Sequence, residues 1–91
     1  MAYTLIYPDS YIKRARKFLR KHPEIHNQYQ KTLEILELDP YHPSLRFHNL
    51  SGRLTDLSSV SINMSYPITL ELEIRDKEVI LVNVGDHAQV Y

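Results

Sequence analysis

The pattern of apolar positions predicts two helices in the first half of the chain. Between Asp9 and Lys21 the apolar residues recur three and four positions apart, which places them on one helix face, and basic residues fill the other face. A second helix is expected to start near Pro23, since proline suits a first helical turn, and to stop before Pro40. Its apolar stripe consists of Ile25, Tyr29, Leu33 and Leu36. A link this short between two helices predicts an antiparallel helical hairpin.

The remaining apolar positions indicate β-strands. Strict alternation over Ile68–Ile74 predicts a half-buried strand, and Leu57–Met64 has a similar pattern. The apolar run Val79–Val84 predicts a strand that is buried on both faces. Thr4–Tyr7 is expected to form a short first strand, and residues 45–50 a strand or an extended arm. Because short links join the last three strands, they should form an antiparallel meander covered by the helices, which gives an α+β fold.

Composition and charge narrow the class of protein. The length of 91 residues predicts a single domain, residues 1–91. The chain contains no cysteine, so we expect neither disulfides nor thiolate metal sites. We expect neither a membrane-spanning segment nor a signal peptide. The net charge is zero, but residues 1–53 carry nine basic and five acidic side chains, whereas residues 54–91 carry two and six. The first part can therefore dock a polyanion through its local field, although a basic helix is also typical of a solvated surface.

Ionisable side chains gather at the carboxyl end of the chain. Gly85, Asp86 and His87 follow the last expected strand, and Tyr91 is the final residue. Histidine transfers protons near neutral pH, so this segment is a candidate for acid–base chemistry, although a solvated tail is the plainer interpretation. A second candidate is His48 in the connector, where an isolated histidine is more often a surface residue. The other histidines are interpreted as surface residues: His22, His26 and His42.

Three segments carry a family resemblance. They are His48–Gly52 (HNLSG), Ser61–Tyr66 (SINMSY) and Val84–Tyr91 (VGDHAQVY). In their order and spacing they resemble the RelE/ParE superfamily of bacterial toxins, the toxin halves of type II toxin–antitoxin pairs. The likeness covers nearly the whole chain and implies an N-terminal strand, an α-helical hairpin and a curved antiparallel sheet. The RelE and YafQ-like branches of this family are ribosome-dependent endoribonucleases that cut mRNA in the A site.

The resemblance implies a site that cleaves RNA without a metal or another cofactor. RNA supplies its own nucleophile, the 2′-hydroxyl, so an enzyme has to remove that proton, stabilise charge on the phosphoryl oxygens and protonate the leaving 5′-oxygen. By the match to the family, His87, His48 and Tyr91 are the catalytic candidates, and which histidine is acid and which is base stays open. The candidates for RNA binding are Arg46, Arg53 and Asn63.

One position departs from the family pattern. The residue after the tyrosine is commonly an arginine that contacts the reacting phosphate, and here it is Pro67. Proline supplies neither a charge nor a backbone donor. Loss of a positioned charge of this kind costs on the order of 100- to 1,000-fold in rate. The chain is therefore expected to cut RNA weakly, to compensate through another base such as Arg53, or to be a non-toxic form.

Two alternative functions stay open beside the nuclease. One is a ParE-like inhibitor that binds DNA gyrase without catalysis, and the other is an inactive toxin that only binds its antitoxin. The histidines favour the nuclease, because gyrase binding needs no proton carrier, whereas Pro67 favours the inactive toxin. For all three, the resemblance implies a cognate antitoxin protein as partner and a cytoplasmic location without a membrane partner. The nuclease would also bind mRNA in the ribosomal A site.

Overall fold

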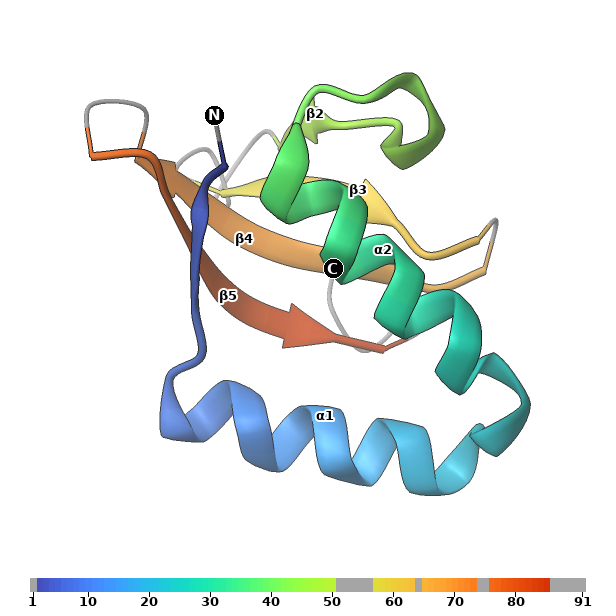
Figure 1. The fold of residues 1–91 in the computed structure, drawn as a ribbon. Helices are drawn as coiled ribbons and strands as arrows, with labels where there is room; N and C mark the ends of the chain where they lie inside the picture. Colours follow the sequence, from blue (N-terminus) through green and yellow to red (C-terminus); the bar gives the residue numbers. More distant parts are fainter. Residues whose placement is uncertain (1, 51–56, 64, 74–75, 86–91) are drawn as a thin grey trace.

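Two helices pack on a five-stranded sheet in this α+β fold, as the pattern predicted (Figure 1). The computed structural model describes residues 2–50, 57–63, 65–73 and 76–85. The elements in chain order are β1 (Thr4–Ile6), α1 (Asp9–Lys21), the 3-10 turn η1 (Pro23–Ile25), α2 (His26–Leu38), the 3-10 turn η2 (Pro43–Leu45), β2 (His48–Asn49), β3 (Ser58–Ser61), β4 (Pro67–Glu73) and β5 (Glu78–Val84).

The strands lie in the order β1-β5-β4-β3-β2. β3, β4 and β5 form the expected antiparallel meander, and β2 extends it as the edge strand after β3. β1 is the other edge and runs parallel to β5, with Thr4 opposite Glu78 and Ile6 opposite Ile80. The sheet is therefore mixed, because α1 carries the chain away from the end of β1 before it returns through the meander (Figure 1).

Both helices contribute to one hydrophobic core on one face of the sheet. α1 runs beside β5, and α2 rises obliquely from the end of α1, so the helical hairpin opens as a V (Figure 1). The two helices meet through a buried hydrogen bond between the hydroxyl groups of Tyr11 and Tyr29, whose oxygens are 2.7 Å apart. The buried apolar side chains of the strands that face this pair are Val60, Ile68, Leu70, Val79, Leu81 and Val84.

The last strand is not buried on both faces, so that expectation was wrong. In β5 the core side chains Val79 and Leu81 alternate with the partly exposed Ile80 and Val82. The reason is that the helices cover only one face of the sheet. The strand also contains a β-bulge, since Asn83 lies opposite Thr69 while Leu81 lies opposite the next residue of β4, and Val82 is the extra residue.

The Tyr11–Tyr29 pair predicts a stability change that depends on pH. Burial, with the neighbouring Tyr29, raises the pKa of Tyr11 above its usual value near 10. Tyr11 therefore ionises less readily in the folded chain than in the unfolded chain. Its contribution to stability is complete below pH ~10 and falls as the pH rises further. In Tyr11→Phe we expect the free energy of unfolding to drop by about 1 kcal/mol at neutral pH, from loss of the hydrogen bond, and to fall less steeply above pH ~10.

Urea unfolding at neutral pH and at several values above pH ~10 measures both effects. Tyr41→Phe is the control, because the Tyr41 side chain is exposed and should change stability by less than about 0.5 kcal/mol. Identical slopes of stability against pH in Tyr11→Phe and the unmodified chain would contradict the role given to this pair.

Candidate functional site

A row of polar side chains crosses the sheet on the face opposite the helices. His48 of β2 is paired with Ser59 of β3, Ser59 with Thr69 of β4, and Thr69 with Asn83 of β5. Paired residues of antiparallel strands share a face, so these four side chains, the polar row, lie on one side. With strands about 4.8 Å apart, the row is about 14 Å long. This is the approximate distance across the sheet from His48 to Asn83.

The middle of the polar row is buried and its β2 end is open. Ser59 and Thr69 are 0% and 1% exposed, whereas His48 is exposed at the edge of the sheet. The hydroxyl of Thr69 donates to the backbone oxygen of Asn83 over 3.4 Å. The side-chain oxygen of Asn83 accepts from the backbone N–H of Val84 at 2.9 Å. The first bond links β4 to β5, and the second lies within β5, just before Gly85.

The local geometry of His48 determines which ring nitrogen is basic. Its Nδ1 lies 3.0 Å from the backbone oxygen of Arg46. A carbonyl oxygen only accepts hydrogen bonds, so Nδ1 carries the hydrogen and Nε2 is the unprotonated nitrogen of the neutral ring. Arg46 itself is exposed and adopts a left-handed backbone with φ 52°, which directs its carbonyl towards the imidazole. His48 is thus arranged to accept a proton at Nε2.

Asn63 was included in the strand predicted over Leu57–Met64, but β3 ends at Ser61 and Asn63 lies just after it. Its side-chain oxygen accepts from the backbone N–H groups of Ser65 and Tyr66, at 2.8 and 3.2 Å, and closes the β3–β4 turn. Its amide nitrogen donates to Gln28 of α2 at 3.3 Å. These contacts stabilise the β3–β4 turn and join it to α2. The proposed contact of Asn63 with RNA stays a prediction.

Three of the candidate residues fall outside the described part of the chain: Arg53, His87 and Tyr91. The structure therefore places two of the six candidates, His48 and Arg46, at one end of the sheet, and Asn63 at the β3–β4 turn. The convergence of His48 and His87 stays a prediction.

Pro67 is the first residue of β4 and is buried. It is paired with Ser61 and faces the same side as Thr69, two positions further along the strand. β4 is an internal strand, and a proline is tolerated there because it occupies the first position. Position 67 is therefore next to the polar row, where a side chain could reach a ligand on that face.

His22 is only partly exposed, so its interpretation as a surface residue was incomplete. Its ring lies 5.1 Å from the ring of Phe18 and 4.9 Å from that of Tyr66, measured between centroids. The Nδ1 atom is 3.4 Å from the Tyr66 hydroxyl and 3.5 Å from the carboxylate of Glu24. The cluster links the end of α1 to the start of β4, a contact that sequence spacing does not reveal.

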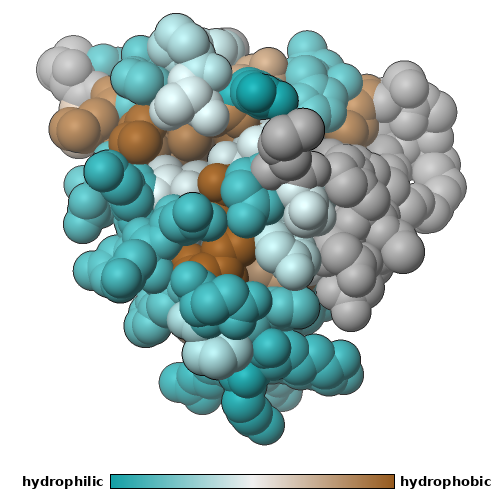
Figure 2. Space-filling view, turned by 90° about the vertical axis from the view of Figure 1, so that its right-hand side faces the viewer, coloured by the Kyte–Doolittle hydropathy of each residue, from teal (hydrophilic) through white to brown (hydrophobic). Residues whose placement is uncertain are grey.

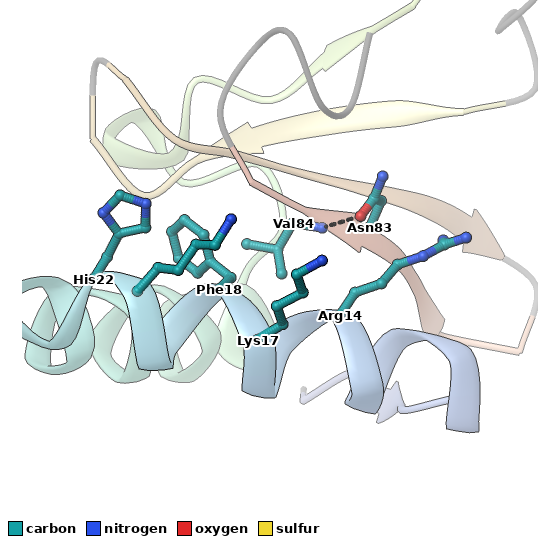
Figure 3. Close-up of a pocket in the computed structure, with 7 residues that line it drawn as sticks. Arg14, Lys17, Phe18, His22, Asn83 and Val84 are labelled. Atoms are coloured by element: carbon teal, nitrogen blue, oxygen red, sulfur yellow. Dashed lines mark hydrogen bonds between the residues drawn. The ribbon is translucent and has the colours of Figure 1, made fainter.

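An open hollow of about 310 Å³ lies between α1 and the end of β5 (Figure 3). Arg14 bridges the two elements, since its guanidinium donates to the backbone oxygen of Val82 at 3.0 Å. Val82 is the bulge residue, and β1 pairs with β5 only as far as Ile80, so this carbonyl gains a partner from the helix. The lining residues are Arg14, Lys17, Phe18, Lys21, His22, Asn83 and Val84.

The spacing of the basic residues on α1 was the available sequence signal for this hollow. Arg14, Lys17 and Lys21 recur at intervals of three and four, which places them along one side of a helix. The sequence could not indicate that β5 ends beside them, because that contact joins residues far apart in the chain.

The sequence matches no family model and no curated protein significantly, whereas solved structures match over nearly its full length. A chain of the Escherichia coli DinJ–YafQ toxin–antitoxin complex is 17% identical, with a TM-score of 0.78, and covers 100% of this chain and 99% of that chain. A copper-bound mutant toxin from Helicobacter pylori is 24% identical over 100% of both chains, with a TM-score of 0.69. The toxin–antitoxin complex RelBE2 from Mycobacterium tuberculosis matches at 17% identity and a TM-score of 0.72, over 96% and 100%.

The fold matches that of the RelE/ParE-like toxins among these structures, which confirms the fold that the resemblance implied. At these identities the likeness concerns the arrangement of helices and strands. Within the described ranges, no helix has the length and apolar character to cross a membrane. In the same part of the chain, no three histidine or acidic side chains are grouped so that they could hold a metal ion.

The bond from Arg14 to Val82 predicts a measurable loss of stability. Arg14→Met keeps much of the aliphatic contact but removes the donor, and we expect the free energy of unfolding to fall by about 1 kcal/mol. Arg16→Met is the matched control, since Arg16 is exposed on the other side of α1 and should change stability by less than about 0.5 kcal/mol. Equal effects of the two substitutions in thermal unfolding would contradict a specific role of Arg14 at the bulge.

Proposed function

We propose that this chain is the toxin of a type II toxin–antitoxin pair and acts as a ribosome-dependent mRNA endoribonuclease whose rate is reduced by Pro67. The observation that carries the proposal is the full-length likeness to toxins such as that of the DinJ–YafQ complex. The two ends of the polar row support it, because the exposed His48 and the partly exposed Asn83 can contact a polar chain, whereas Ser59 and Thr69 between them are buried. The fold alone does not define a chemistry.

His48 is the general base in this proposal. Its Nε2 is the free nitrogen of the neutral ring and lies on an exposed edge strand, so it can take the proton of the 2′-hydroxyl. His87 protonates the leaving 5′-oxygen, and Tyr91 stacks on a base or orients a proton. Asn83 is four residues before His87, a span of at most about 14 Å of extended chain. The mechanism requires His87 to lie within reach of the same phosphate as His48.

Pro67 accounts for the reduced rate. It occupies a position next to the polar row where an arginine could contact the reacting phosphate. The row itself contains no positive side chain other than a protonated His48, so the charge on the phosphoryl oxygens has to be stabilised by residues outside it, for which Arg46 and Arg53 are the candidates. A form that only binds its antitoxin is the second candidate function, and the buried proline favours it.

An antitoxin protein is the proposed partner in either case. The structures with this fold include complexes of a toxin with an antitoxin, DinJ–YafQ and RelBE2. A partner segment with acidic side chains would complement the basic α1 and would fold as it binds. Co-purification of the chain with the product of a neighbouring small gene tests this part of the proposal.

Removal of the proposed base should abolish cleavage. In a cell-free translation reaction, we expect His48→Ala to cut ribosome-bound message on the order of 100- to 10,000-fold more slowly, because a general base contributes about that factor. Primer extension on the message measures the rate. His26→Ala is the control, since His26 is exposed on α2, away from the sheet. Unchanged cleavage in His48→Ala would remove His48 from the mechanism.

Restoring a cation at position 67 should raise the rate. We expect Pro67→Arg to cleave message on the order of 100- to 1,000-fold faster and to arrest growth when it is produced without antitoxin. Pro67→Gln is the control, because it fills the position without a charge. If neither variant cleaves message, the endoribonuclease proposal fails, and DNA supercoiling and relaxation assays then test the gyrase-binding alternative.

A further inference from the structure

α1 carries six basic residues in two stripes of equal spacing. Both stripes follow the interval of three and then four residues. The inner stripe, Arg14, Lys17 and Lys21, lines the hollow against β5. The outer stripe consists of Lys13, Arg16 and Arg20. By helix geometry the outer stripe lies on the side away from the buried residues Tyr11, Ala15 and Phe18. Of the two stripes, only the inner one therefore lines the hollow.

The hollow offers hydrogen-bond donors and no carboxylate among the described residues that line it. Lys17 and Arg14 extend from α1 towards β5, with Asn83 and Val84 on the opposite wall (Figure 3). Seen from the side where α1 leads into α2, the surface over the end of α1 is mostly hydrophilic and borders a small hydrophobic area (Figure 2). Clustered donors of this kind favour an anionic ligand.

The charges form a line and not a single point. Arg14 is held by its bond to Val82, and Lys17 and Lys21 follow at helical rises of about 4.5 and about 6 Å. A row of cations along a helix complements a chain of regularly spaced negative charges better than one isolated ion. The ligand expected from this spacing is a polyanion that runs along α1.

Two observations favour single-stranded RNA over an acidic peptide. Aromatic rings lie at the Lys21 end of the hollow, where the partly exposed His22 and Tyr66 contact each other and could stack on a base. Asn83 also belongs to both the hollow and the polar row, so RNA bound in the hollow lies beside the β5 end of the row.

The rest of the open face repels a polyanion. Glu71 and Glu73 of β4 and Glu78 of β5 lie on this face towards the other end of the two strands. Like charges disfavour the approach of phosphates there, so a bound RNA is directed to the Asn83 end.

We propose that the hollow between α1 and the end of β5 binds the phosphodiester backbone of the single-stranded RNA that enters the polar row, through Lys17 and Lys21. The inference rests on the proposed function, since it assigns a binding path to the same substrate. Arg14 joins α1 to β5 through its hydrogen bond to Val82 and adds a positive charge. His22 and Tyr66 contact a base beside the backbone.

The two stripes provide a matched experiment. Lys17→Gln/Lys21→Gln removes two charges four residues apart from the inner stripe, and Arg16→Gln/Arg20→Gln removes two with the same spacing from the outer stripe. The probe is a short fluorescent 2′-O-methyl RNA, which lacks the attacking hydroxyl and cannot be cleaved. Its affinity for each purified protein is measured by fluorescence anisotropy over a range of salt concentrations.

We expect the inner variant to bind this RNA about tenfold more weakly at moderate salt and to lower the slope of log affinity against log salt by about 1.4, since single strands contribute about 0.7 per contact. The outer variant should bind nearly as the unmodified chain does. Lys17→Arg/Lys21→Arg should restore binding, which separates lost charge from a folding defect. Equal weakening by the inner and outer variants would overturn the proposal.

A poly-glutamate peptide of matched charge distinguishes the class of ligand. If the inner variant loses affinity for this peptide as strongly as for RNA, the assignment to RNA is wrong. Primer extension separates the inference from the proposed function. Stripe-dependent RNA binding without cleavage of message supports this inference and contradicts the nuclease, whereas cleavage that both stripe variants retain contradicts only the inference.

Discussion

The two helices of this chain both pack on one face of the five-stranded sheet (Figure 1), and the location of the candidate site depends on that arrangement. The apolar side chains of β3, β4 and β5 that face α1 and α2 form the core, and the alternate positions of the same strands are left on the other face. Because strand side chains alternate, a polar residue between two core residues is placed on the open face without further design. Thr69 lies between the core residues Ile68 and Leu70 in this way, and strand pairing brings Ser59, Asn83 and His48 into one row with it.

The β-bulge at Val82 joins this open face to α1. An extra residue changes the phase of the strand, so that Leu81 and Val84 both reach the core although they are three positions apart. Asn83 then lies opposite Thr69 and also lines the hollow beside the helix. The guanidinium of Arg14 donates a hydrogen bond to the displaced carbonyl oxygen of Val82. The helix can supply this donor because β1 is too short to pair with Val82. The bulge is therefore a part of the site as well as of the sheet.

Much of the fold could be predicted from local pattern. α1 begins and ends where its apolar spacing and Pro23 indicated, and β4 follows the alternation of its residues. The errors concern contacts between distant segments. β5 was expected to be buried on both faces because its residues are almost all apolar, yet the second face has no helix to cover it. His22 was interpreted as a surface residue because nothing near it in sequence shows that Tyr66 packs against its ring.

The sequence by itself determined which residues form helices and strands, and it named the ionisable groups from which any acid–base chemistry must come. It could do so because periodicity and turn residues act over a few positions of the chain. Only the tertiary structure decided which of these groups share a surface. The parallel pairing of β1 with β5 and the meeting of Lys17 and Lys21 with the end of β5 both arise from contacts across the fold. Such contacts depend on the packing of whole elements, which no short stretch of sequence specifies.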